Sequence, residues 1–208
     1  MNHEIIKIHS PYPTLDMQIA RQCAPLLTGI KVSNILITSQ VHLNSIYETF
    51  RYSEIQIKII YSEAERLTML LYQPEKLLSY IHQEQILQVM MKLGYAPMEL
   101  EQILELFTER FEAYRKKMQA FPHELGILLG YPLADVVGFM ENGGKNAIYT
   151  GYWKVYEDFP EALDTFYQYK RAQEALTYLV SSGVSVKQIL RMAQAGKEIL
   201  NIKQLVAV

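Results

Sequence analysis

The stretch FPHELGILLGYPLADVVGFMENGGKN, residues 121–146, concentrates the side chains most able to do chemistry. His123 can transfer protons near neutral pH, and Glu124 can orient an imidazole or bind a metal ion with it. Neighbouring residues on a helix point about 100° apart, so these two side chains do not converge unaided. They also fit a plain helix start, with Pro122 opening the helix and Glu124 near the positive end of its dipole. Both interpretations stay open.

The segment ENGGKN at residues 141–146 offers a second candidate. The amides of Gly143 and Gly144 can turn toward an anion, and Lys145 can add charge. The segment lacks the spacing of a nucleotide-binding fingerprint, and a helix stop followed by a loop explains it as well. Five residues of this region are candidate ligand contacts: Tyr131, Asp135, Glu141, Asn142 and Lys145.

The segment GYWKVY at residues 151–156 holds the only tryptophan of the chain, Trp153. If the segment is a strand, alternation places Trp153 and Val155 on one face, and Tyr152, Lys154 and Tyr156 on the other. One set anchors the core. The other forms either an aromatic shelf with a cation, suited to a flat or anionic ligand, or a face that a helix covers.

These candidates need a scaffold, and four β-prone segments supply part of it. Residues 33–39 form a short apolar run, and residues 54–62 alternate isoleucine with polar residues. We expect residues 54–62 and 68–73 to form a hairpin. Residues 147–156 are expected to form one or two short strands that join this sheet, because a lone strand leaves its amides unpaired.

Helical periodicity covers most of the remaining chain. Helices are expected over residues 14–24 with Pro25 as the stop, from Pro74 to Gly94, over 97–118 with Pro97 in the first turn, from Pro132 to Gly143, from a cap at Asp158 to about Val180, and after a cap at Ser185. The predicted class is therefore α+β, predominantly helical, with a small and mostly antiparallel sheet. We expect a single domain over 1–208. The alternative is an α+β part at 1–95 and a mainly helical part at 96–208.

Composition narrows the class of function. Half of the 208 residues are hydrophobic, a fifth are charged and the formal net charge is −2, which disfavours nucleic-acid binding. The single cysteine excludes an internal disulfide, and the five histidines lack metal-ligand spacing. No segment reaches the roughly 20 apolar residues of a membrane span. The amino terminus lacks the pattern of a signal peptide, so we expect a cytoplasmic protein.

The long motif at 121–146 together with GYWKVY resembles a bacterial family catalogued as domain of unknown function thirty-seven ninety-three. CAPLLTGIKVSNIL (residues 23–36), LLYQPEKLLSYI and LGYAPMELEQIL resemble its other segments. The resemblance implies a single cytosolic unit and supplies no activity. Members often carry cysteines just before the GYWKVY-like motif and in the helix after it. Here Thr150 and Lys170 or Arg171 occupy those places, so a mechanism that needs these thiols is in doubt.

The leading hypothesis is a small-ligand or cofactor-binding protein, with its pocket between the helix ends of 121–146 and the aromatic strand. Tyr152, Trp153 and Tyr156 would stack on the ligand, and Lys145 and Lys154 would contact an anionic group. His123 with Glu124 would orient the ligand or transfer a proton. The first alternative is an enzyme that uses His123 as acid–base and Lys154 to stabilise negative charge. The second is an interaction module with a flat aromatic patch. The identity of any cofactor stays open.

Overall fold

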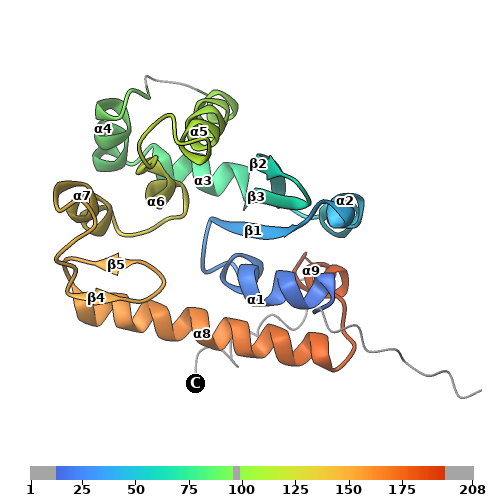
Figure 1. Ribbon diagram of the computed structural model, residues 1–208. Coiled ribbons are helices and arrows are strands. Elements are labelled where there is room, and N and C mark those ends of the chain that lie inside the picture. The colour runs from blue at the N-terminus through green and yellow to red at the C-terminus, as the bar shows by residue number, and fades with distance from the viewer. Residues whose placement is uncertain (1–12, 96–98, 195–208) are drawn as a thin grey trace, which may run out of the picture.

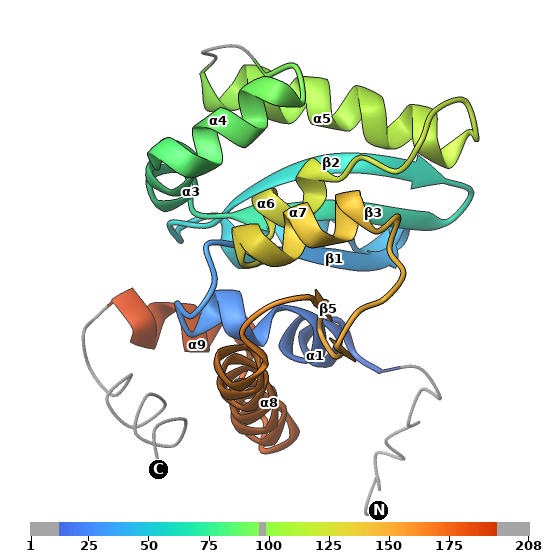
Figure 2. The ribbon, with the colours of Figure 1, turned by 90° about the vertical axis from the view of Figure 1, so that its left-hand side faces the viewer.

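A three-stranded sheet divides the helices of the computed structural model into two layers (Figures 1 and 2). The structure describes residues 13–95 and 99–194. Helices from the two ends of the described chain form one layer, and helices from its middle form the other. The predicted α+β class, with helix predominating, is confirmed. None of the helices in these ranges has the length and apolar composition that crossing a bilayer requires.

The central sheet has the strand order β1-β3-β2, and every pairing is antiparallel. Its strands are β1 (Ser33–Ser39), β2 (Gln56–Glu63) and β3 (Arg66–Tyr72), which confirms the three predicted strands and the hairpin. β3 lies in the middle and buries side chains on both faces: Met69 packs into one layer and Leu70 into the other. This two-sided burial explains why β3 is almost wholly apolar, whereas β2 alternates.

The first layer joins distant parts of the sequence, since α1 (Leu15–Leu27) lies beside α8 (Phe159–Ser181) (Figure 1). It also contains the short helices η1 (Gln40–His42) and α2 (Leu43–Phe50), and α9 (Val186–Gln194). The caps predicted for the last two helices are present. Asp158 Oδ1 accepts a hydrogen bond from the amide of Glu161 at 3.2 Å, and Ser185 exchanges hydrogen bonds with Gln188.

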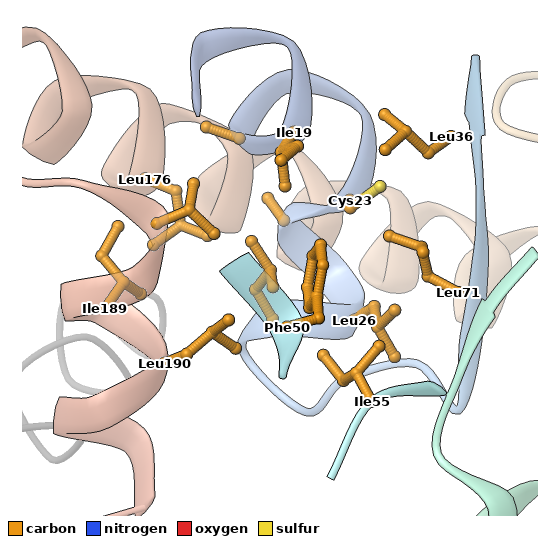
Figure 3. Packing of buried hydrophobic residues seen from close by; sticks show 14 of the residues in the cluster. Ile19, Cys23, Leu26, Leu36, Phe50, Ile55, Leu71, Leu176, Ile189 and Leu190 are labelled. Carbon is orange, nitrogen blue, oxygen red and sulfur yellow. The ribbon is translucent and has the colours of Figure 1, made fainter. Parts of the chain in front are cut away.

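Side chains of this layer and the sheet form an apolar core around Cys23 (Figure 3). Ile19, Cys23 and Leu26 come from α1, and Phe50 and Leu176 approach them from α2 and α8. The Cys23 thiol is fully buried, and this burial raises its pKa to about 12. A thiol held protonated in this way is a poor nucleophile, so Cys23 acts as a packing residue.

The prediction that Pro25 ends the first helix is wrong, because α1 continues to Leu27 with Pro25 inside it. A proline has no amide hydrogen, so the carbonyl of Arg21 loses its usual helical donor. The side-chain amide of Gln173 on α8 donates to that carbonyl at 2.8 Å instead. A tertiary contact thus satisfies the acceptor that the proline leaves open, and the helix tolerates it.

The second layer contains two helices where one was predicted between Pro74 and Gly94. These are α3 (Pro74–Ile81) and α4 (Glu84–Lys92), separated at Gln83, whose backbone is extended with φ −60° and ψ 132°. Gly94 follows α4 with φ +86°, which agrees with its predicted role as the terminating glycine. α5 (Leu100–Arg115) starts with a capping box, and Pro97 lies outside the described residues.

Helices α6 (Glu124–Leu128) and α7 (Leu133–Glu141) complete this layer and face a small β-ribbon. The ribbon consists of β4 (Tyr149–Thr150) and β5 (Lys154–Val155), which pair with each other. The expectation that this segment joins the main sheet is therefore wrong: its own hairpin supplies the hydrogen-bond partners that a lone strand would lack. Figure 1 shows the ribbon between α7 and α8.

The ribbon docks on α7 through Gly138. An added Cβ at Gly138 would lie 2.6 Å from Cβ of Tyr156, a contact that forces the helix and the ribbon apart. In the ribbon, Gly151 has the same role toward α8, because its added Cβ would lie 2.2 Å from the Phe166 ring. Two glycines thus set how closely the ribbon approaches its neighbours.

Gly138→Ala tests this docking. Overpacking costs ~1–3 kcal/mol and the gain in helix propensity returns about 1 kcal/mol, so we expect a net loss of about 1 kcal/mol in the free energy of unfolding. Urea denaturation measures it. Ala134→Gly, at an exposed position of α7, calibrates the propensity contribution alone. A Gly138→Ala variant more stable than the natural chain would contradict the tight contact with Tyr156.

Candidate functional site

A cavity of about 390 Å³ lies between α6 and α7 on one side and the ribbon on the other. Figure 2 shows how these elements face each other. This volume is in the range of small-molecule sites, roughly 300–1,000 Å³. Five aromatic side chains line the cavity: Phe121, Tyr131, Phe139, Tyr152 and Trp153. Leu125, Leu129 and Val136 add aliphatic surface, and His123, Asp135 and Lys154 are the charged or titratable residues of the lining.

The Asp135 carboxylate fixes the ribbon side of the cavity. Oδ2 accepts a hydrogen bond from the Trp153 indole N–H at 2.6 Å, and Oδ1 accepts from the amides of Tyr156 at 2.7 Å and Glu157 at 3.1 Å. Asp135 is 5 % exposed and lies in the first turn of α7, where the helix dipole favours a negative charge. One buried carboxylate therefore holds three donors of the ribbon in place.

Trp153 forms a rigid wall because aromatic rings surround it. Its indole stacks on Tyr131 at 5.1 Å between ring centroids and meets the edge of Phe166 at 4.4 Å. Trp153 and Val155 are both buried, so of the two sets that alternation separates, this one anchors the core. Trp153 also lines the cavity, so the core-anchoring face and the site share this residue.

His123 lies at the N-cap of α6 and contributes to the cavity wall. Its ring packs between Phe121 and Phe139, at centroid distances of 5.7 Å and 5.6 Å. Nδ1 is buried and has no hydrogen-bond partner in the described part of the chain. An unmatched buried polar atom costs free energy, which makes His123 an unusual residue of this wall.

Glu124 does not work with His123 in this geometry. Its carboxylate is 3 % exposed and accepts hydrogen bonds from the Tyr95 hydroxyl at 2.8 Å and the Arg110 guanidinium at 3.2 Å. Burial, followed by the nearby Glu124 charge, raises the pKa of Tyr95. The predicted pair thus separates into a cavity-lining histidine and a glutamate that joins α6 to α4 and α5, as the divergence of neighbouring helical residues requires.

The ENGGKN segment uses its own amides to close the end of α7. The amide of Gly144 donates to the Phe139 carbonyl at 2.9 Å, and that of Lys145 donates to the Asn142 carbonyl at 3.0 Å. The Asn142 side chain donates to the Gly138 carbonyl at 2.8 Å. These bonds favour the helix-stop interpretation. Glu141 and Lys145 are exposed, and the cavity lining includes neither them nor Asn142.

Of the other predicted ligand contacts in the GYWKVY segment, Lys154 and Tyr152 line the cavity and Tyr156 does not. Lys154 lines the cavity, donates to the Gly144 carbonyl at 2.5 Å and lies 5.8 Å above the Phe139 ring. Tyr152 lies at the rim and is 45 % exposed. Tyr156 packs against Gly138 outside the lining, and its hydroxyl is buried without a partner in the described chain.

Sequence reasoning missed part of the wall. Phe139 lies one helical turn after Asp135, and Gly126 lies three residues after His123, so helical spacing could have placed both on the cavity side. No role was predicted for Lys31, although this lysine lies between Ile30 and Val32 just before a buried strand.

No group of three or more His, Cys, Asp or Glu side chains within residues 13–95 and 99–194 has the arrangement of a metal site. His3 and His9 lie outside these ranges.

Asp135→Asn tests the carboxylate clamp. The amide replaces one acceptor with a donor, so either the indole of Trp153 or the backbone amides of Tyr156 and Glu157 face an N–H group. We expect a loss of about 2 kcal/mol in unfolding free energy, the usual scale for bonds to a charged acceptor, and a red shift of the Trp153 fluorescence. Glu141→Gln, an exposed acid of the same helix, is the control. Equal stability of the two variants would contradict the clamp.

The comparisons with known proteins give a family and no activity. A family model described as "Protein of unknown function (DUF3793)" matches residues 19–190. No curated protein and no solved structure matches the chain. The matched range includes α6, α7 and the ribbon, and with them the whole lining of the cavity. The chain therefore belongs to the DUF3793 family.

Proposed function

We propose that this chain is a cytoplasmic small-ligand-binding protein, and that its ligand binds in the cavity between α6, α7 and the ribbon. The cavity itself, with an aromatic wall that includes His123, carries the proposal. Binding sites combine mostly apolar surface with a few polar groups that fix orientation, and this cavity has both.

The lining suits a ligand with a flat, apolar body. Tyr131 and Trp153 present stacked rings, and Phe121 and Phe139 flank the imidazole of His123. Their partners hold these rings before any ligand arrives, which lowers the ordering cost of binding. A hydrogen bond with the imidazole of His123 would then set the orientation of the ligand.

The enzyme alternative places His123 in contact with the substrate as acid–base. It requires a second group to orient or charge the imidazole, and Glu124 and Asp135 are both committed to other donors. The geometry therefore supports ligand binding better than acid–base catalysis by a histidine–carboxylate pair.

The interaction alternative has an observation of its own. Apolar side chains are exposed along the ribbon and the start of α8: Ile148, Tyr149, Tyr152, Leu163 and Tyr167. An exposed apolar patch of this kind suits a partner chain. Partner binding at this patch and ligand binding in the cavity predict different sensitivities to mutation, because Leu163 and Tyr167 do not line the cavity.

Thr150→Phe is the test of ligand binding. Thr150 is an exposed residue of the cavity lining, so a phenyl ring there obstructs the cavity without disturbing the core. A panel of adenine nucleotides, flavins, tetrapyrroles and aromatic carboxylates is screened by thermal denaturation. A ligand at a hundred times its Kd stabilises the natural chain by about 2.7 kcal/mol, or several degrees in Tm. Thr150→Phe removes this shift.

Val41→Phe is the matched control, since Val41 is 78 % exposed on η1 and lies outside the cavity lining. Native mass spectrometry of the protein purified from its source cells extends the screen to ligands outside the panel. Absence of any bound small molecule together with no Tm shift across the panel would contradict the proposal. A ligand that stabilises Thr150→Phe as much as Val41→Phe would place its site elsewhere.

A further inference from the structure

Lys31 is a buried lysine with no matching acid. Its side chain lies just before β1 and is 8 % exposed. No carboxylate pairs with its ammonium group and no hydrogen bond reaches it within the described residues. Its contacts are two aromatic rings: Nζ lies 5.0 Å from the centroid of Tyr131 and 5.6 Å from that of Tyr169.

This placement is costly for a charged group. Burial lowers the pKa of Lys31 to about 8, opposed by the influence of Cys23. Contacts with the faces of aromatic rings recover part of the lost hydration, but less than a carboxylate would. Buried charges in proteins are normally paired, so an unpaired one in a cavity indicates that the partner comes from outside the chain.

Lys31 lines a second cavity, of about 140 Å³, between α1, β1 and α8. Arg21 and the side-chain amides of Gln22, Asn34 and Gln173 also line it, and no acidic residue does. The amides of Gln22, Asn34 and Gln173 already donate to backbone carbonyls, so the walls offer an anion the positive charge of Lys31 and Arg21 without a competing carboxylate. The volume corresponds to a few water molecules at about 30 Å³ each, enough for a carboxylate or a phosphate group and too small for a whole nucleotide.

The two cavities share part of their walls. Leu129, Tyr131 and Tyr152 line both of them. Tyr131 contacts the Lys31 ammonium group and also stacks on Trp153, so one ring belongs to the walls of both the polar cavity and the aromatic one. A single ligand with an apolar body and an anionic end fits this arrangement.

We propose that the Lys31 cavity is an anion subsite, which binds the carboxylate or phosphate end of a ligand whose apolar body occupies the larger cavity. The anion would form an ion pair with the ammonium group of Lys31, with Arg21 supplying further positive charge at the same cavity. The assignment of the ligand body rests on the proposed function, whereas the anion subsite rests on Lys31 itself.

Three naphthalene probes test the proposal: 2-naphthoate, 2-naphthyl phosphate and the neutral 2-naphthalenemethanol. Isothermal titration calorimetry gives their Kd values for the natural chain and for Lys31→Met. We expect the natural chain to prefer an anionic probe over the neutral one by roughly ten- to a hundredfold, the scale of a bond to a charged group. Which anion is preferred distinguishes a carboxylate ligand from a phosphate ligand. Lys31→Met removes the preference, and Lys31→Arg retains it.

The variants keep the test independent of folding. Methionine replaces an unpaired buried charge with an apolar chain of similar length, so Lys31→Met retains the fold. Lys92→Met, at an exposed position of α4, is the matched control and keeps the preference for anions. Equal binding of neutral and anionic probes by the natural chain, or the same anion preference in Lys31→Met, would overturn the subsite while leaving the ligand cavity in place.

Inorganic phosphate separates the two proposals. If no naphthalene probe binds but phosphate raises the Tm of the natural chain and not that of Lys31→Met at equal ionic strength, the anion subsite stands and the larger cavity loses its support. If neither the naphthalene probes nor phosphate binds, the subsite is overturned.

The same titrations have a predicted pH dependence. The Lys31 ammonium group loses its proton as pH rises through about 8, so the affinity for 2-naphthoate falls across that range. Lys31→Met shows no such fall.

The other titratable or charged groups near Lys31 are Cys23, Arg21, Tyr131, Tyr152 and Tyr169. Burial raises the pKa of Cys23 and of these three tyrosines, so they stay neutral over this range. An affinity that is independent of pH between 7 and about 9 would contradict the role of Lys31.

Discussion

The carboxylate of Asp135 is the interaction on which the candidate site depends. Each strand of the ribbon is only two residues long, and an isolated hairpin of that size has no stability of its own. Asp135 supplies what the ribbon lacks, since it accepts one indole and two backbone hydrogen bonds at the start of α7. The close contact between Gly138 and Tyr156 also sets the distance between α7 and the ribbon. Trp153 becomes a fixed wall as a consequence, and a cavity remains between the ribbon and the two helices.

The buried polar groups of the molecule divide into matched and unmatched ones. Glu124 meets Arg110 and Tyr95, and Ser33 donates to the Leu128 carbonyl, so these groups serve the fold. His123 and Lys31 have no polar partner in the described chain, and both line cavities. Folding alone gives no reason to retain such residues, because apolar side chains would cost less. The Tyr156 hydroxyl is also unmatched but lines neither cavity, so an unmatched group indicates a ligand site only where its residue lines a cavity, as His123 and Lys31 do.

Local patterns were readable from the sequence, and contacts between distant segments were not. The alternation in β2 and the apolar run of β1 predicted both strands, because the period of a strand is a local property. The prediction that the first helix ends at Pro25 was wrong, because Gln173, far along the chain, donates a hydrogen bond to the open carbonyl of Arg21. The expectation that the ribbon joins the main sheet was wrong for a different reason, because β4 and β5 pair with each other. The placement of His123 and Trp153 around one cavity was predicted from the family resemblance and their polar surroundings. The burial of Lys31 was not predicted, because it depends on Tyr169 of α8, and no local pattern reveals that contact. The division into domains stays a prediction.

The indole N–H resonance of Trp153 in a proton–nitrogen NMR spectrum tests the central claim most directly, because a single tryptophan gives a single indole signal. If Asp135 holds the indole as a wall of a ligand cavity, the signal is sharp, the proton exchanges slowly with water, and addition of 2-naphthoate shifts the signal in a saturable way. An indole proton that exchanges as fast as in an unfolded peptide, with a signal that 2-naphthoate leaves unmoved, would contradict both the clamp and the site built on it.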